Sequence, residues 1–218
     1  MDIEIKKIKV GEIKTNCYLI YCGDSLAIVD PGGDFEKIQE ALESHKKPKE
    51  GLILLTHWHY DHLLALNSLR KVYPDYKIVA GCDEAENISE VPIQGLYTGF
   101  EISSVPVPEI LALDGETLKF GECEIKVIFT PGHSVGSVCY KIGDNLFSGD
   151  TLFYHVYGRT DLINGSHEQM EKSLKKLFSM NGNLYILPGH GKETSLDIER
   201  KYFRKHAKDM GLEESLFS

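Results

Sequence analysis

The sequence predicts an α/β sandwich built from mixed, mostly antiparallel sheets. Short β-rich runs and amphipathic helical runs alternate irregularly along the chain, and many of the β runs are joined by tight turns. A doubly wound parallel sheet would instead need a helical crossover after almost every strand. The chain also contains two similar halves, each with a pair of strands followed by a helix and a further β run.

The strand pairs are the first elements of each half. In the first half, "YLIYCGDSLAIVDPGG" reads as two strands around a turn at Gly23-Asp24. In the second half, "SVCYKIGDNLFSGDT" repeats the pattern around Gly143-Asp144-Asn145. Turn residues between β-branched and aromatic runs are typical of hairpins. Short apolar runs, "GLILLT" and "NLYILP", come later in each half and lead into histidines.

Helical periodicity follows each strand pair. Residues 34–46 and 166–178 place apolar side chains on one face, and the second stretch opens with a capping box from Ser166 to Gln169. A further helix is predicted over residues 61–73. The last helix is predicted from about Leu196 to Lys208, after a Thr194/Ser195 cap.

Composition describes an ordinary globular chain with an acidic balance. Its 218 residues suffice for one sizeable core, so we expect a single domain over residues 1–218. The net charge of −9 disfavours nucleic acid as a partner, and the basic residues of the C-terminal helix are interpreted as a solvated face. There is neither a bilayer-spanning run nor a signal-peptide core, so we expect a cytoplasmic protein with no membrane partner.

The cysteines are predicted to be free thiols. Their number is odd and they form no C-x-x-C pair, which in a cytoplasmic protein indicates reduced side chains. We therefore expect neither a disulfide nor a metal-binding role, and no need for them in catalysis. The five are Cys17, Cys22, Cys82, Cys123 and Cys139.

Polar, ionisable side chains gather where the apolar β runs end. The stretch "LLTHWHYDH" places three histidines and an aspartate within six positions, and single residues follow three other β runs. Burial of such groups is costly unless each finds a partner. Five histidines and two carboxylates at one sandwich edge suit one or two first-row metal ions. The candidate ligands are His57, His59, Asp61, His62, His133, Asp150 and His190.

The motif H-x-H-x-D-H, which spans His57 to His62, resembles the signature of the metallo-β-lactamase-fold hydrolases. The resemblance runs from Thr15 to about Phe203 and includes "VDPGG", "TPGHSVGS", "FSGDTLF" and "LPGHG". The glyoxalase-II-like group is most similar, since "GDTLF…GRTDL" is typical of it. One departure is Leu63-Leu64-Ala65, where many members of that group have small glycines. The resemblance implies a four-layer αββα sandwich made of two similar halves.

Carried onto this chain, the resemblance implies two divalent metal ions, with zinc expected and iron or manganese as alternatives. The first two motif histidines and His133 would hold one ion. The last two motif residues and His190 would hold the other, with Asp150 as the bridge. Asp30, in "VDPGG", is interpreted as a support of the site and not as a ligand.

The implied reaction is hydrolysis of a small acyl thioester by a hydroxide that bridges the two metal ions, as in glyoxalase II. Asp61 and Asp150 are the expected catalytic carboxylates. Only 218 − 190 = 28 residues follow His190, so the glutathione site is expected to be incomplete.

The substrate pocket is predicted less directly. The loop after Asp150 is a candidate for lining it, because loops at strand ends often carry function. Its candidate side chains are Tyr154, His155 and Tyr157. Three alternatives to thioester hydrolysis stay open: a mononuclear-iron persulfide dioxygenase, a lactonase, and a metal-binding protein without turnover.

Overall fold

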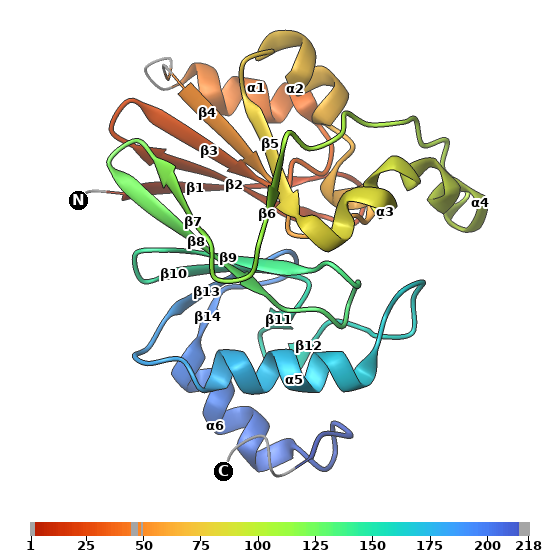
Figure 1. Ribbon diagram of the computed structural model, residues 1–218, viewed down its shortest axis with the longest axis vertical. Helices are drawn as coiled ribbons and strands as arrows, with labels where there is room; N and C mark the ends of the chain where they lie inside the picture. Colours follow the sequence, from red (N-terminus) through yellow and green to blue (C-terminus); the bar gives the residue numbers. More distant parts are fainter. Residues whose placement is uncertain (1–2, 45–47, 49, 214–218) are drawn as a thin grey trace.

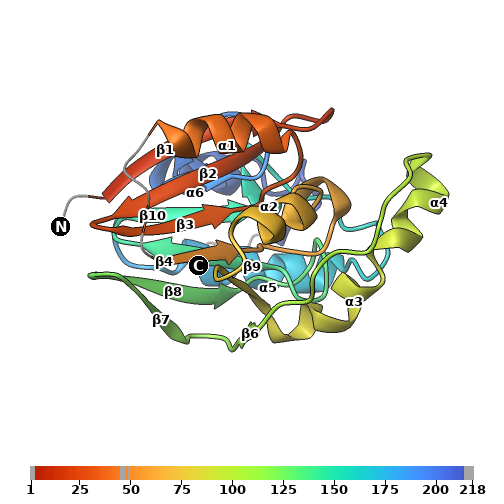
Figure 2. The ribbon, with the colours of Figure 1, turned by 90° about the horizontal axis from the view of Figure 1, so that it is seen from above.

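Two six-stranded sheets pack face to face between two helical layers in the computed structural model, which describes residues 3–44, 48 and 50–213 (Figures 1 and 2). The predicted four-layer αββα sandwich is therefore confirmed. The strands of the first sheet lie in chain order: β1 (Ile3–Val10), β2 (Thr15–Cys22), β3 (Ser25–Val29), β4 (Glu50–Leu54), β5 (Lys77–Gly81) and β6 (Ile110–Ala112).

The first sheet is mixed. β1, β2 and β3 pair antiparallel, whereas β3 to β6 pair parallel. The second sheet has the order β14-β13-β10-β9-β8-β7, and only the β10–β13 pair is parallel. Its strands are β7 (Thr117–Phe120), β8 (Cys123–Phe129), β9 (Val138–Ile142), β10 (Asn145–Gly149), β13 (Tyr185–Pro188) and β14 (Thr194–Ser195).

The duplication is visible in the topology. In the first half an antiparallel pair, β2–β3, is followed by helix α1 (Phe35–Glu43) and by β4 parallel to β3. In the second half the pair β9–β10 is followed by helix α5 (His167–Phe178) and by β13 parallel to β10. A small hairpin, β11 (Leu152–Phe153) with β12 (Val156–Tyr157), is inserted before α5.

Three hydrophobic cores fill the spaces between the four layers. One lies between the first sheet and helices α1 and α2 (Leu66–Val72), a second between the two sheets, and a third between the second sheet and helices α5 and α6 (Leu196–His206). β2 shows why this sheet needs apolar residues on both faces, since Leu19 faces the first core and Ile20 the second. Burial on both faces explains its continuous apolar sequence.

The predicted helices are present with shifted ends. Ser166 caps α5 by accepting a hydrogen bond from the backbone N of Gln169, as the capping box predicts. The α1 helix ends at Glu43, and the last two residues of its predicted range lie outside the described residues. The single helix predicted over 61–73 is instead a 3₁₀ turn η1 (Tyr60–His62) followed by α2. The tighter turn orients the last two residues of the motif toward the sheet edge.

An arm of short helices leaves the sandwich after β5 and projects past the sheet edge (Figures 1 and 2). It consists of η2 (Cys82–Glu84), α3 (Ala85–Ser89), η3 (Val91–Gln94) and α4 (Gly95–Thr98). No described helix combines the length and the apolar character that crossing a membrane requires.

The prediction of five free thiols is wrong for two of them. Cys22 and Cys123 form a disulfide, while Cys17, Cys82 and Cys139 are free. Cys22 ends β2 and Cys123 begins β8, so the bridge crosses the space between the two sheets. Their Cα atoms are 6.3 Å apart, within the range that a disulfide spans. A separation of 101 residues hides this pairing from sequence inspection.

Candidate metal centre

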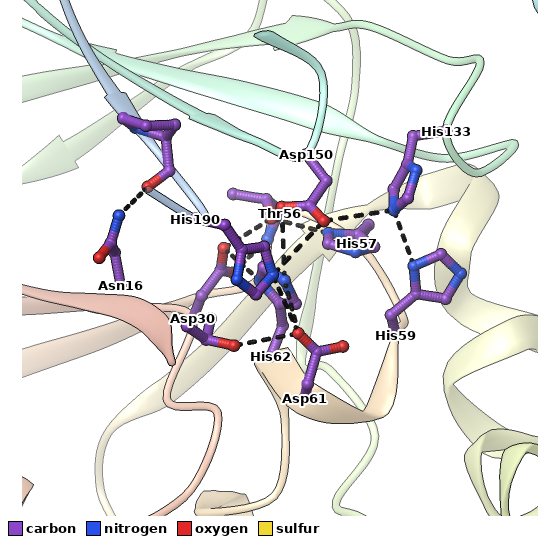
Figure 3. A network of polar contacts seen from close by, with 12 residues as sticks. Asn16, Asp30, Thr56, His57, His59, Asp61, His62, His133, Asp150 and His190 are labelled. Atoms are coloured by element: carbon purple, nitrogen blue, oxygen red, sulfur yellow. Dashed lines mark hydrogen bonds and ion pairs between the residues drawn. The ribbon is translucent and has the colours of Figure 1, made fainter. Parts of the chain in front are cut away.

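The predicted ligands all follow strands that end at one edge of the sandwich. His57 follows β4, and Asp150 and His190 follow the parallel neighbours β10 and β13. Parallel strands bring their carboxyl ends to the same edge, so residues far apart in sequence become neighbours. Figure 3 shows the five histidines and the two aspartates converging there.

Three histidines form the first group. The rings of His57, His59 and His133 lie edge to face with centroids 4.6–4.9 Å apart. His59 Nδ1 is 2.9 Å from His133 Nε2, and one nitrogen from each ring lies within 4.8 Å of the others. An all-nitrogen group of this size suits a zinc or iron ion.

Asp61, His62 and His190 form the second group. Asp61 Oδ2 is 3.2 Å from both His62 Nε2 and His190 Nε2. Asp150 lies between the groups, with Oδ1 3.5 Å from His62 Nε2 and Oδ2 3.5 Å from His133 Nε2. The arrangement places one carboxylate in contact range of both groups, as a bridge requires.

Unpartnered polar atoms show that a cation fits this cluster. Among the described residues, His57 Nε2, His62 Nε2 and Asp150 Oδ1 are buried and have no hydrogen-bond partner. Burying such atoms without a partner costs about 1–3 kcal/mol each. One donor from each of these residues also lies within 4.8 Å of the others, so cations held by the two groups would satisfy all three atoms.

Asp30 supports the cluster from behind. Its two carboxylate oxygens accept from the backbone N and from Oγ1 of Thr56, at 2.8 and 2.7 Å. Asp30 Oδ2 also lies 2.9 Å from His62 Nδ1, which must donate to it. The carboxylate thereby fixes the tautomer of His62 and turns Nε2 toward the cluster.

Two further histidines are oriented in the same way. Thr56 Oγ1 gives its one proton to Asp30, so His57 Nδ1 is the donor in its 3.0 Å contact with Thr56. His133 Nδ1 donates to the carbonyl oxygen of Arg159 at 2.8 Å. In both rings Nε2 keeps its lone pair free to bind a cation.

The electrostatics match a metal site. Burial holds the pKa of His57 well below its usual value, and burial together with His133 lowers the pKa of His59 to about 3. Burial would also lower the pKa of His62, but Asp61, Asp30 and Asp150 raise it well above its usual value. A cation would therefore find neutral nitrogens with free lone pairs on His57 and His59, and it would take the place of the proton that the carboxylates favour on His62.

Three supporting residues escaped the sequence analysis. Thr15 Oγ1 donates to Asp61 Oδ2 at 3.0 Å, and Asn16 donates from its side chain to Pro188 O and from its backbone to Gly189 O. The buried Gln94, in the arm, donates to Trp58 O and accepts from Tyr60 N. A polar pair such as Thr15-Asn16 at the start of an apolar strand is the sequence signal that marks such a role.

A buried acid holds the loop that carries His133. Glu84 Oε1 accepts a hydrogen bond from Ser134 Oγ, which is also 2.7 Å from Ser137 Oγ. Burial raises the pKa of Glu84 to about 7. The contact ties the arm of the first half to the ligand loop of the second.

Two glycines are required by close packing around Asp150. A Cβ on Gly189 would overlap Asp150 Oδ1, and a Cβ on Gly158 would overlap the carbonyl oxygen of Asp150. These glycines belong to "LPGHG" and "GRTDL". Close packing is therefore a steric reason for both motifs, and "LPGHG" also carries the candidate ligand His190.

A cavity of about 410 Å³ opens beside the cluster. It touches five of the candidate ligands, and its other walls come from the loop before β2, from Tyr60, from the arm, and from residues 159–163. Those other lining residues are Ile13, Tyr60, Gln94, Tyr97, Thr98, Arg159, Leu162 and Ile163.

The loop predicted to line the pocket lies elsewhere. Tyr154 carries Lys192 Nζ over its ring at 3.3 Å, and His155 donates from its backbone to Glu199 at 2.8 Å. Tyr157 donates from its hydroxyl to Met210 O at 2.9 Å. These contacts tie the β11–β12 hairpin to the C-terminal segments and leave none of the three side chains at the cavity.

Comparison with known proteins identifies the family. A family model described as the metallo-beta-lactamase superfamily matches residues 10–190. A probable metallo-hydrolase of Bacillus subtilis, YqgX, is 35% identical over 204 residues, which cover 89% of this chain and 93% of that protein. The hydroxyacylglutathione hydrolase GloC of Haemophilus influenzae is 30% identical, and the match covers 92% of this chain and 96% of that protein.

Comparison with solved structures supports the same family. The BLEG-1 B3 metallo-beta-lactamase superposes with a TM-score of 0.84 at 32% identity, over 91% of this chain and 97% of that one. A protein crystallised in a di-iron-bound form gives a TM-score of 0.81 at 29% identity, over 90% and 98% of the two chains. With these matches and the histidine–aspartate cluster at its sheet edge, this chain belongs to the metallo-β-lactamase superfamily as a metallo-hydrolase.

Proposed function

We propose that this protein hydrolyses a small acyl thioester with two divalent cations, most simply zinc. The observation that carries the proposal is the pair of ligand groups that share Asp150 beside an open cavity. The name of the Haemophilus relative, a hydroxyacylglutathione hydrolase, supports a thioester as the substrate class.

The residues divide between the two cations as the resemblance implies. His57, His59 and His133 hold one, and the second group holds the other. When bound, two such cations lower the pKa of a shared water to about 7 and polarise a carbonyl oxygen. The two aspartates offset the positive charge of the cations, and Thr15 fixes the orientation of Asp61 by donating to Oδ2.

Asp61 has a further role in this proposal. It lines the cavity as well as belonging to the cluster, so it is within reach of a substrate. A carboxylate in this position can accept a proton as the tetrahedral adduct of the acyl group breaks down.

The rate of turnover should rise with pH through the neutral region, because the attacking water loses its proton there.

Metal content tests the first part of the proposal. Protein purified without added metal should contain, or take up, close to two divalent ions per chain, as measured by elemental analysis. Zinc is expected, and the di-iron-bound neighbour makes iron the main alternative. One iron with oxygen consumption on a persulfide would point to a dioxygenase. No metal uptake at all would refute the two-ion site.

Substrate turnover tests the second part. The two-metal protein should release thiol from small acyl thioesters such as S-lactoylglutathione, followed with a colorimetric thiol reagent. A β-lactam is a second candidate, because the solved B3 metallo-beta-lactamase matches 91% of this chain. Cleavage of a chromogenic β-lactam or a lactone without cleavage of any thioester would refute the thioester assignment and keep the hydrolase.

A further inference from the structure

The cavity beside the metal centre has an apolar mouth. Five of its lining side chains are apolar or aromatic, and three of them are strongly exposed: Ile13 (49%), Tyr97 (54%) and Ile163 (50%). The other two, Tyr60 and Leu162, are half-buried. Exposed apolar side chains gathered around one opening mark a surface that a ligand covers.

Basic groups are scarce at this opening. In the described part of the chain, Arg159 is the one lysine or arginine among the lining residues. Its guanidinium is already engaged, since Nε and Nη2 donate to the two carboxylate oxygens of Asp161 at 2.7 and 2.8 Å. A bidentate pair of this kind uses two of the five N–H donors of the guanidinium and offsets its charge, which weakens its attraction for a substrate carboxylate.

No lysine close in sequence to the lining residues takes over the role of Arg159. Lys192 follows the ligand His190 in sequence, but its Nζ lies over the ring of Tyr154, which is outside the cavity. Lys14 follows Ile13 and is exposed, yet it is not among the residues that line the opening. The positive charges closest in sequence to the cavity thus face away from it or into solvent.

A second cavity extends the same surface and is acidic. It has a volume of about 440 Å³ and shares Ile13, Tyr60 and Asp61 with the first. Leu64, one of the residues that depart from the family pattern, adds to its apolar lining. Its wall also carries four exposed carboxylates and no lysine or arginine among the described lining residues. The four are Glu12, Asp34, Glu36 and Glu101. The charge of Asp34 is offset by Lys37, whose Nζ lies 2.5 Å from Asp34 Oδ2, and the other three carboxylates make the wall acidic.

We propose that the natural substrate is a thioester with an apolar body and no net negative charge, rather than a glutathione thioester. This inference rests on the proposed function and refines it. Glutathione carries two carboxylates and one ammonium group, so at neutral pH its thioesters need cationic partners that this opening does not provide. Desolvating those carboxylates beside a carboxylate-lined wall is unfavourable.

A matched substrate pair tests the charge preference. The acetyl thioesters of glutathione and of N-acetylcysteamine share the reacting group and differ in the charge of the thiol part. The two-metal protein should give a kcat/KM at least about tenfold higher for the neutral thioester, mainly through a lower KM. Raising the salt concentration should narrow this gap, because salt screens the repulsion.

Two variants test the cause. Asp161→Asn frees Arg159 and should raise kcat/KM for the glutathione thioester by about two- to fivefold, the size of an exposed ion pair, with the neutral thioester unchanged. Ile163→Lys should raise the rate for the anionic substrate and lower it for the neutral one. Glu168→Gln is the matched control, since it frees Lys172 from an equally exposed pair on α5, outside the cavity lining.

The outcomes separate the two proposals. If the loaded protein cleaves neither thioester, the proposed function is refuted and this inference with it. If it cleaves both, and the glutathione thioester has the equal or higher kcat/KM, the charge inference alone is refuted. The inference is supported if the protein prefers the neutral thioester, if Asp161→Asn narrows the ratio of the two kcat/KM values, and if Glu168→Gln leaves that ratio unchanged. If both variants change the ratio equally, the preference does not arise at this opening and the inference is overturned.

Discussion

Replacing Asp150 by alanine should reduce turnover by about 10³-fold or more and leave at most one tightly bound ion per chain. Among the described residues, Asp150 is the one carboxylate within 3.5 Å of histidines from both ligand groups, so its loss removes the shared ligand and one of the two charges that neutralise the cations. Several kcal/mol of transition-state stabilisation depend on such a site, and each 1.4 kcal/mol is about a factor of ten in rate.

Asp30→Ala is the matched control, since it removes a second aspartate from the same edge, one that is buried more deeply than Asp150. Asp30 contacts His62 and Thr56 and offers no free oxygen to the cluster. Its removal leaves the donors of Thr56 and His62 unsatisfied, which should lower the free energy of unfolding by about 1–3 kcal/mol. Metal affinity should weaken by about 10–100-fold, but two ions should still bind at saturation.

Elemental analysis after metal saturation, with thermal unfolding of the metal-free forms, distinguishes the two variants. Asp150→Ala should bind fewer metal ions per chain than the wild type. The Tm of its metal-free form should fall little, because Asp150 Oδ1 has no protein hydrogen-bond partner. Equal metal content in the two saturated variants would mean that the division between ligand and support is wrong.

The metal cluster was accessible from the sequence because its chemistry leaves few alternatives. Histidines and aspartates that interrupt apolar runs need a partner, and the partner of several such groups at one sheet edge is a cation. The α/β sandwich with mixed sheets followed from hairpin turns and helical periodicity, which are local signals, whereas the four-layer arrangement followed from the family resemblance. The capping contact of Ser166 is the clearest case, since it depends on four consecutive residues.

The residues that support the ligands and those that line the cavity could not be predicted from the sequence in the same way. Gln94 contacts Trp58 and Tyr60 from an arm whose short helices have no strong periodicity, and Glu84 reaches Ser134 across 50 residues. The hairpin with Tyr154 and His155 follows a ligand in sequence but is held on α6 by Glu199. Proximity in sequence to a ligand therefore did not predict proximity to the cavity.

The disulfide is the largest departure from the sequence prediction, and its position lies far from the metal centre. Cys22 pairs with Ser25 at one end of the β2–β3 hairpin, whereas Asp30 follows the other end of β3. Cys123 likewise begins β8, whose far end leads into the loop of His133. The bridge thus joins the two sheets at the edge opposite the metal centre.

Removing the bridge should lower stability strongly without changing turnover. The double variant Cys22→Ala/Cys123→Ala opens a loop closed across 101 residues, and the loss of a disulfide typically lowers the free energy of unfolding by about 2–4 kcal/mol. For a chain of this size that corresponds to a fall in Tm of about 5–15 °C. The control is Cys17→Ala/Cys139→Ala, which removes two equally buried but unbridged sulfurs.

Both double variants lose the packing of two buried sulfur atoms, so the difference between their Tm values isolates the cross-link. Dithiothreitol should bring the wild-type Tm down toward that of Cys22→Ala/Cys123→Ala and leave this variant unaffected. Thiol titration of the unfolded, unreduced protein should find the three free cysteines and not five. Because the bridge and the metal centre lie at opposite edges, kcat at 25 °C should stay the same in the variant that lacks the bridge. Five titrated thiols, or equal Tm values for the two double variants, would restore the original expectation of free cysteines.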